Sequence, residues 1–327
     1  KDSYLSGSDH NDYMVNSNKS IVAGGMGGDR IIGTDDAEYV FGDSGDDQLL
    51  VSGGDDVIFG GAGKDYINGG DGDDVIDAGT GKDFMDGGKG NDVYLFHRGS
   101  GTDSIMDCDG ENTILFDEGL KAGDIKAYRS NWNDLLLTFD GLEDTLNLKN
   151  YCISEEARNF NLVFADGTIV KATDANSPLR TIYGTDGSEY MTSIYTDGIT
   201  KIGQDGDDQL VGSNGDDFLY GGKGNDRITG NGGDDVLDGG EGDDYLYGEA
   251  GNDTYIFKPG YGTDTIGDGK GTNTIEIYGY SPSQIKAYRT NWNNITITFG
   301  DSEDRLIIEG FFISEADRNF YLPLNVR

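Results

Sequence analysis

Hydrophobic residues recur at every ninth position along two stretches of the chain, and an acidic residue stands two positions before each of them. The acidic residues of residues 24–95 are Asp29, Glu38, Asp47, Asp56, Asp65, Asp74, Asp83 and Asp92, and those of residues 203–256 are Asp208, Asp217, Asp226, Asp235, Asp244 and Asp253. Side chains two positions apart in a strand point to the same face, so each acidic residue and its hydrophobic partner share a face. Glycines before each pair supply the backbone freedom of a tight turn. The pattern predicts one turn and one short strand per repeat.

The period of nine residues also predicts how the turns stack. Two repeats, each with one turn and one strand, close one coil of about 18 residues. Like turns then lie beneath one another at every second repeat, and acidic residues one coil apart face each other. The predicted pairs are Asp29 with Asp47, Glu38 with Asp56, Asp47 with Asp65, Asp56 with Asp74, Asp65 with Asp83, Asp74 with Asp92, Asp208 with Asp226, Asp217 with Asp235, Asp226 with Asp244 and Asp235 with Asp253.

Stacked turns with facing carboxylates predict a site for a hard cation. Calcium takes six to eight oxygen ligands, and two carboxylates with nearby turn carbonyls can fill that shell. Zinc prefers thiolates and imidazoles, and neither array contains a cysteine or a histidine. We therefore expect the turns to bind calcium.

The sequences GGAGKDYIN (60–68) and GGDGDDVID (69–77) resemble the G-G-x-G-x-D-x-U-x nonapeptide of the RTX (haemolysin-type) calcium-binding repeats. The resemblance implies an all-β fold of two tandem parallel β-rolls, each followed by a β-rich flanking or capping domain. It also implies about 8–12 bound calcium ions and a parent protein that is a type I-secreted bacterial toxin or adhesin.

The resemblance further implies which residues hold the ions. Carbonyls at the second and fourth places of one turn, and at the first and third places of the turn one coil later, join the two carboxylates. The implied residues of the first array are Gly25, Gly27, Asp29, Gly42, Ser44, Gly45, Asp47, Gly53, Gly54, Asp56, Gly60, Gly61, Ala62, Gly63, Asp65, Gly69, Gly70, Asp71, Gly72, Asp74, Ala78, Thr80, Asp83, Gly87, Lys89 and Asp92. Those of the second array are Gly206, Asp208, Gly215, Asp217, Gly221, Gly222, Lys223, Gly224, Asp226, Gly230, Gly232, Gly233, Asp235, Gly239, Glu241, Asp244, Gly248, Ala250 and Asp253. Asp103 and Asp264, in the segments after the arrays, are expected to complete terminal sites, whereas the repeat 33–41 departs from the pattern in having no fourth-place glycine and Glu38 at the sixth place.

A longer repeat divides the chain into two modules. The sequence IKAYRSNWN (125–133) returns as IKAYRTNWN (285–293), and NDVYLF (91–96) returns as NDTYIF (252–257). The segments 134–139 and 294–299 are predicted strands that follow a polar hairpin turn. The predicted organisation is a degenerate repeat or N-terminal cap at 1–23, a β-roll at 24–95, a flanking β domain at 96–172, a linker and degenerate opening repeat at 173–202, a second β-roll at 203–256 and a second, C-terminally incomplete flanking domain at 257–327.

Charge determines what the calcium is expected to do. The chain has 61 acidic and 24 basic residues, a formal net charge of -37. Low hydrophobicity with a large charge of one sign favours the unfolded chain, so we expect the arrays to be unfolded at cytosolic calcium and to fold at the roughly 10⁻⁴ to 10⁻³ M at which extracellular modules bind. Nucleic acid is excluded as a partner by the same charge, and no apolar run is long enough for a transmembrane helix. The chain begins with Lys1 and is expected to be part of a longer secreted protein.

No catalytic motif is present, and the module is predicted to be non-enzymatic. It is expected to support secretion through the type I apparatus, and the folding of a larger toxin, enzyme or adhesin outside the cell or on its surface. The alternative is an adhesin module that binds a host receptor or glycan through its flanking domains, where Trp132 and Trp292 occupy equivalent turns; packing of both tryptophans against their own sheets is the competing interpretation. Cys108 and Cys152 can pair or remain thiols, and the sequence does not decide between the two.

Overall fold

The computed structural model describes residues 4–130, 133–151, 160–171, 177–192, 196–267, 270–310 and 320–321. Over these residues the chain is built from β-strands, with short 3₁₀ turns at η1 (Ala122–Asp124), η3 (Pro178–Arg180) and η4 (Pro282–Gln284). The chain forms two units, Lys1–Leu179 and Arg180–Arg327. No helix among the described residues has the length and hydrophobicity required to cross a membrane.

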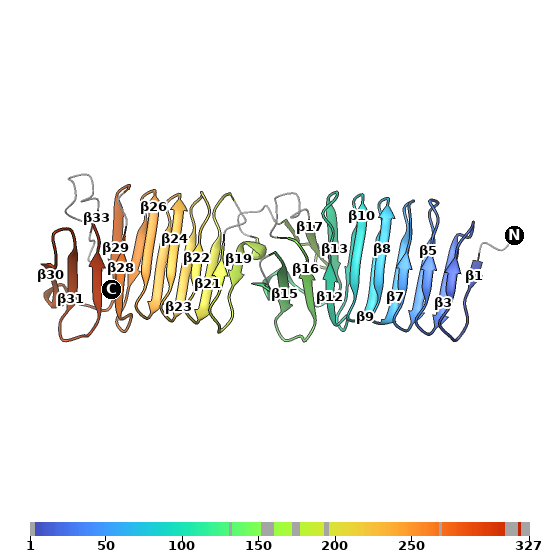
Figure 1. Ribbon diagram of the computed structural model, residues 1–327, viewed down its shortest axis with the longest axis horizontal. Helices are drawn as coiled ribbons and strands as arrows, with labels where there is room; N and C mark the ends of the chain where they lie inside the picture. Colours follow the sequence, from blue (N-terminus) through green and yellow to red (C-terminus); the bar gives the residue numbers. More distant parts are fainter. Residues whose placement is uncertain are drawn as a thin grey trace. The chain divides into compact units, whose positions relative to one another are not determined.

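The first unit contains two sheets, and successive strands of the roll join opposite sheets (Figure 1). One sheet has the order β1 (Tyr4–Ser6), β3 (Ile21–Met26), β5 (Tyr39–Ser44), β7 (Val57–Gly63), β9 (Val75–Gly81), β11 (Val93–Phe96), β13 (Asn112–Phe116), β17 (Phe160–Phe164) and β18 (Ile169–Lys171). The other has the order β2 (Tyr13–Val15), β4 (Arg30–Ile32), β6 (Gln48–Leu50), β8 (Tyr66–Asp71), β10 (Phe84–Lys89), β12 (Thr102–Ile105), β16 (Thr145–Leu148), β15 (Leu135–Phe139) and β14 (Ile125–Arg129).

The second unit repeats this arrangement. One sheet has the order β19 (Thr181–Tyr183), β21 (Thr200–Asp205), β23 (Phe218–Lys223), β25 (Val236–Glu241), β27 (Thr254–Phe257), β29 (Asn273–Ile277) and β33 (Phe320–Tyr321). The other has the order β20 (Tyr190–Met191), β22 (Gln209–Val211), β24 (Arg227–Gly232), β26 (Tyr245–Ala250), β28 (Thr263–Ile266), β32 (Arg305–Ile308), β31 (Ile295–Phe299) and β30 (Ile285–Arg289). The prediction of parallel β-rolls followed by β-rich flanks is confirmed.

The register of the parallel strands gives the coil its length. Ile58 pairs with Ile76, and Leu219 pairs with Leu237, in each case the equivalent residue of the next coil. The hydrophobic eighth-place residues point inward, and Ile58, Ile76 and Leu219 are 0% exposed. Each coil therefore buries one such residue from each sheet, and two facing columns of side chains form the narrow core of each roll.

The flank of each unit caps the open end of its roll. In the first unit β14, β15 and β16 form an antiparallel meander, and β16 pairs in parallel with β12. In the second unit β30, β31 and β32 do the same against β28. The predicted strands at 134–139 and 294–299 correspond to β15 and β31. Aromatic rings fill the junction in the first unit, where Phe116 lies 5.9 Å from Phe96, 5.6 Å from Phe139 and 4.9 Å from Phe164 between ring centroids.

Candidate metal centres

The sixth-place carboxylates form ladders along the edges of both rolls. The backbone N–H of ten sixth-place residues donates a hydrogen bond of 2.6–3.0 Å to Oδ1 of the aspartate 18 residues later. These bonds join all ten of the pairs expected from the sequence. The structure therefore brings together the carboxylates that the nine-residue period places one coil apart.

The second oxygen of many of these carboxylates is buried without a donor. No hydrogen-bond donor among the described residues reaches Oδ2 of Asp29, Asp47, Asp56, Asp65, Asp74, Asp226 or Asp235. A buried carboxylate oxygen without a partner is costly, because it has lost its hydration without compensation. A row of such atoms is the arrangement that a cation would satisfy.

The first-place glycines provide the space beside these oxygens. A Cβ on Gly60 would lie 2.5 Å from the carbonyl oxygen of Ala78 and 2.6 Å from Oδ2 of Asp65. The carboxylate of one turn and the first-place carbonyl of the next coil therefore point at the same small space. Gly42 faces the corresponding atoms, the carbonyl oxygen of Gly60 and Oδ2 of Asp47.

The turns need glycine for a second reason, which concerns the backbone. Gly61 and Gly63, at the second and fourth places, have φ angles of 113° and 142°, a region that side chains with a Cβ rarely adopt. Some second-place residues other than glycine also adopt a left-handed conformation, as Asp43 and Asn231 do with φ angles of 72° and 80°. Space thus favours glycine at the first place, where Val51 and Ala78 are the exceptions in the first array, and backbone conformation favours it at the second and fourth.

The third-place carbonyls are held in position by the preceding coil. The fourth-place N–H of Gly45 donates to the carbonyl oxygen of Ala62, and that of Gly72 donates to the carbonyl oxygen of Lys89, both at 2.8 Å. A carbonyl oxygen has two lone pairs, so each of these carbonyls keeps one for another partner. The side chains of Lys89 and Asp71, by contrast, form an exposed ion pair at 2.9 Å.

The donor set suits calcium. Carboxylate and carbonyl oxygens are the ligands that calcium prefers, in flexible geometries of six to eight oxygens. No group of three or more histidine, cysteine, aspartate or glutamate side chains suited to a metal occurs in the described part of the chain, so a site here depends on backbone carbonyls as well as carboxylates. The residues fit the ion that the sequence pattern indicates.

Burial controls the protonation of these carboxyls. Burial raises the pKa of Asp56, Asp65 and Asp226 to about 7, and neighbouring carboxylates contribute to the increase. The hydrogen bond that each accepts from the sixth-place N–H of the preceding coil acts in the opposite direction. Burial also raises the pKa of Asp235 to about 8. The carboxyls resist ionisation in the absence of a cation, because charge in a buried row is neither solvated nor neutralised.

Each array ends on residues that continue its ladders. Asp103 accepts the N–H of Asp83 at 3.0 Å, and Asp264 accepts that of Asp244 at 3.1 Å. Burial is the largest influence on Asp103 and raises its pKa to about 8. The hydrogen bond from the N–H of Asp83 opposes this increase, and the negative charge of Asp83 adds to it. The structure thus places both expected terminal residues in line with the array.

Two asparagines at the ends of the other ladders were not expected from the sequence. Asn112 accepts the N–H of Asp92, and Asn273 accepts that of Asp253, both at 2.8 Å and across 20 residues instead of 18. The two extra residues after each array shift them out of the nine-residue frame. Their shared position in the two modules is the signal that identifies them.

A second, exposed ladder runs along the fifth places and was also missed. The N–H of Asp73 donates to Oδ1 of Asp55 at 3.0 Å, and the N–H of Asn225 donates to Oδ1 of Asp207 at 2.7 Å. These bonds point back along the chain, opposite to the sixth-place bonds. The recurrence of Asp or Asn at the fifth place was the available sequence signal.

Two sixth-place residues are satisfied by the protein itself. The carboxylate of Glu38 accepts the N–H and hydroxyl of Thr34 and the side-chain amide of Asn16. The carboxylate of Asp217 accepts the N–H and hydroxyl of Ser213. These turns therefore lack the donor-free oxygen of their neighbours.

The remaining candidates lie in the flanks. Trp292 is 86% exposed, so the interpretation that it packs against its own sheet is wrong for this residue. Trp132 and Cys152 lie outside the described residues, and Cys108 is exposed.

Comparisons with known proteins agree with the repeat pattern. The family model of the RTX calcium-binding nonapeptide repeat (4 copies) matches residues 23–58, 41–75, 59–94, 202–237 and 220–255. Among solved structures, the chain is similar to the extracellular lipase LipA of Serratia marcescens at 18% identity, with a TM-score of 0.27, over 91% of this chain and 40% of the lipase. It is similar to a subunit of the mannuronan C5-epimerase of Azotobacter vinelandii at 23% identity, with a TM-score of 0.29, over 51% of this chain and 83% of that subunit. The chain thus spans less than half the length of the lipase. No curated protein matches it.

Proposed function

We propose that this chain, whose residues 23–94 and 202–255 are RTX calcium-binding nonapeptide repeats, is a folding module that responds to calcium in a larger secreted protein. The observation that carries the proposal is the row of buried aspartate Oδ2 atoms without a donor, at Asp47, Asp56 and Asp65 among others. Each is satisfied when the module is loaded with calcium and is costly when it is not.

Charge and core size make folding dependent on the ion. A net charge of -37 opposes the compact state, and the core of each roll is narrow, with one column of side chains from each sheet. Calcium neutralises the carboxylates and links adjacent coils, so binding free energy becomes folding free energy. The chain then stays unfolded at the low calcium of the bacterial cytosol and folds at the higher calcium outside.

This behaviour suits a protein that leaves the cell through the type I secretion apparatus. An unfolded chain can pass through a narrow channel, and external calcium then orders the two rolls beside whatever toxin, enzyme or adhesin domain is attached. The module itself is non-catalytic, and the rolls act as scaffold and folding nucleus.

Circular dichroism of the full chain tests the proposal. We expect a coil spectrum after calcium is removed, and a β spectrum when calcium is raised to millimolar concentration. Asp65→Asn should raise the calcium midpoint, whereas Asp46→Asn, at an exposed fifth place, should leave it nearly unchanged. A chain that already shows the full β spectrum without calcium would contradict the proposal.

One observation favours a second function, that of an adhesin module. Trp292 is 86% exposed in the turn between β30 and β31, and an exposed indole ring can stack on a sugar or pack against a protein. Glycan-array binding by the calcium-loaded chain that is lost in Trp292→Ala, and retained in Tyr288→Ala on the preceding strand, would support this function. Equal binding by the Trp292→Ala variant would exclude Trp292 as the contact.

A further inference from the structure

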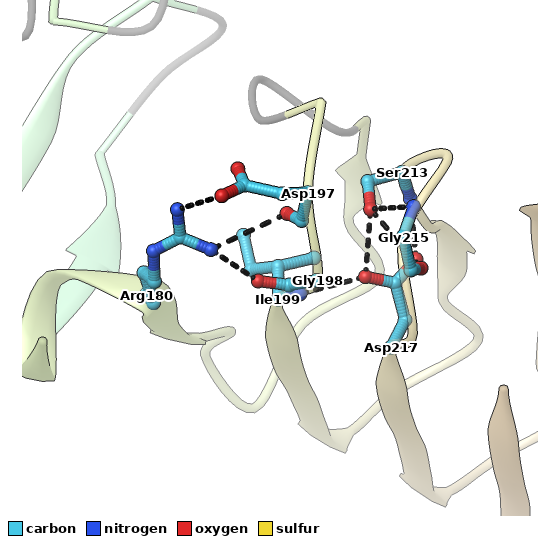
Figure 2. A network of polar contacts seen from close by, with 7 residues as sticks. All are labelled: Arg180, Asp197, Gly198, Ile199, Ser213, Gly215 and Asp217. Atoms are coloured by element: carbon cyan, nitrogen blue, oxygen red, sulfur yellow. Dashed lines mark hydrogen bonds and ion pairs between the residues drawn. The ribbon is translucent and has the colours of Figure 1, made fainter. Parts of the chain in front are cut away.

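Asp217 differs from the other sixth-place aspartates in its partners (Figure 2). Its Oδ1 accepts the backbone N–H of Ile199 at 2.6 Å and the hydroxyl of Ser213 at 2.9 Å. Its Oδ2 accepts the backbone N–H of Ser213. Asp235, one coil later on the same edge, accepts the N–H of Asp217 at Oδ1, and no donor from the described residues reaches its Oδ2.

The turn that faces Asp217 from the preceding coil has no carboxylate at the sixth place. Ile199 occupies that position, and a guanidinium holds the turn instead. Nη1 of Arg180 donates to the carbonyl oxygen of Gly198 at 2.7 Å and to that of Asp197 at 3.4 Å, and Nη2 lies 2.7 Å from Oδ2 of Asp197. Arg180 is only 6% exposed. Its charge therefore meets the carbonyls of this turn inside the protein, as Figure 2 shows.

A second cation lies in the core of the same coil. Lys201 occupies the eighth place, where the residues paired with it in the adjacent coils are Ile182 and Leu219, and it is 1% exposed. Its Nζ donates to the carbonyl oxygen of Met191 at 3.1 Å and to that of Val211. A buried ammonium beside the turn repels a divalent cation.

The first-place carbonyl of the Asp217 repeat is also occupied. The side-chain amide of Asn231 donates to the carbonyl oxygen of Gly212 at 2.8 Å. The hydroxyl oxygen of Ser213 in turn accepts the backbone N–H of Gly215 at 3.0 Å. Both carboxylate oxygens of Asp217 are therefore engaged by protein donors. Because buried cations also stand where the preceding coil lacks a carboxylate, the residues of this turn do not fit calcium.

We propose that Arg180, Lys201 and Ser213 replace calcium at this turn, so that Asp217 holds no ion and the second array begins with a metal-free coil. The proposal rests on the proposed function, because it takes the other turns to be calcium sites. The guanidinium and the ammonium are cations attached to the chain, so they are present at every calcium concentration. The first coil of the second roll then keeps its cross-links whatever the calcium level, and the calcium-bound coils stack on it.

The same hydroxyl contact marks other turns near the start of each array. Thr34 donates its hydroxyl to Glu38, Ser8 donates its hydroxyl to Asp12, and Thr185 donates its hydroxyl to Glu189. In each case the serine or threonine stands at the second place, four residues before the carboxylate. A hydroxyl that bonds the carboxylate from this place substitutes for the ion in the turn.

Native mass spectrometry of the full chain in saturating calcium tests the proposal by counting ions. Asp217→Asn should retain the wild-type number of ions, whereas Asp235→Asn should lose at least one. The two variants are matched, because asparagine keeps the Oδ1 acceptor for the preceding N–H in both. Loss of as many ions from Asp217→Asn as from Asp235→Asn would overturn the proposal. A wild-type chain that binds no calcium would instead overturn the proposed function, and the metal-free coil with it.

Thermal unfolding in saturating calcium gives an independent measurement. Arg180→Gln should lower the unfolding midpoint of the second unit without changing the ion count. Arg227→Gln is the control, because Arg227 lies over the ring of Tyr247 on the outer face of the roll and should change the midpoint little. Equal midpoints for the two variants would show that Arg180 does not hold the coil together, and would contradict its role as a substitute for calcium.

Discussion

The backbone N–H of Asp65 donates a hydrogen bond of 2.8 Å to Oδ1 of Asp83, one coil further along the chain. The bond uses Oδ1 of Asp83, just as the N–H of Asp47 uses Oδ1 of Asp65, and Oδ2 of Asp65 stays buried without a donor among the described residues. One oxygen therefore aligns the coils while the other is available to a cation. Each aspartate joins two turns, so the loss of one carboxylate affects the coils on both sides.

The first prediction concerns this double role. Asp65→Asn keeps an acceptor for the N–H of Asp47 and removes the charge, so the coil remains aligned but binds calcium less tightly. We expect the calcium midpoint of folding to rise roughly tenfold, which corresponds to about 1.4 kcal/mol. Asp46→Asn is the control, because Asp46 is exposed and accepts only the N–H of Lys64 in the fifth-place ladder. Equal midpoints for the two variants, measured by circular dichroism, would be evidence against a ligand role for Asp65.

The second prediction concerns backbone conformation. Gly63 has a φ of 142°, and a Cβ there would overlap the carbonyl oxygen of Gly45. Gly63→Ala should therefore destabilise the first unit by roughly 1–3 kcal/mol in saturating calcium. Gly123→Ala is a suitable control, since no atom lies within 4 Å of a Cβ built on Gly123 and its φ is not left-handed. Thermal unfolding of both variants measures the difference, and similar midpoints would contradict the steric argument.

Much of the roll follows from the period alone, because a nine-residue unit has one way to place Ile58 over Ile76 and Asp56 beside Asp74. The features that sequence reasoning missed break or ignore that period. Asn112 is shifted by the two-residue insertion after the array. Position 217 carries the expected aspartate, but its carboxylate accepts hydrogen bonds from Ser213 and from Ile199 of the preceding coil. A repeat pattern specifies equivalent positions and does not specify which of them a neighbouring side chain has already satisfied.

The third prediction concerns a contact that spans some 40 residues in both modules. Asp304 accepts the N–H groups of Gly260 and Gly262 at 3.0 and 3.1 Å, as Asp144 does from Gly99 and Gly101 in the first unit. Burial alone would raise the pKa of Asp304, but hydrogen bonds from Ser302, Tyr280 and the two glycines outweigh it, and the pKa lies below its ordinary value. Asp304→Ala should lower the stability of the second unit by roughly 1–3 kcal/mol, because two backbone donors lose their acceptor. Asp301→Ala, at an exposed position, is the control and should change the denaturant midpoint little. If Asp301→Ala lowers the midpoint as much as Asp304→Ala does, the hydrogen bonds of Asp304 to Gly260 and Gly262 do not stabilise the unit.

The last prediction concerns pH. Burial raises the pKa of Asp56, Asp65 and Asp226 to about 7 in the folded chain without metal, whereas an aspartate of the unfolded chain titrates near pH 3.9. Between about pH 4 and 7 the folded metal-free chain therefore binds more protons than the unfolded chain, so its stability falls as pH rises through this window. Calcium-depleted protein should accordingly show more β structure at pH 5 than at pH 8 by circular dichroism. The calcium midpoint of folding should change little between pH 8 and pH 6, because these carboxylates are ionised both in the unfolded chain and beside the bound ion. Equal β structure in calcium-depleted protein at pH 5 and pH 8 would show that folding does not raise these pKa values.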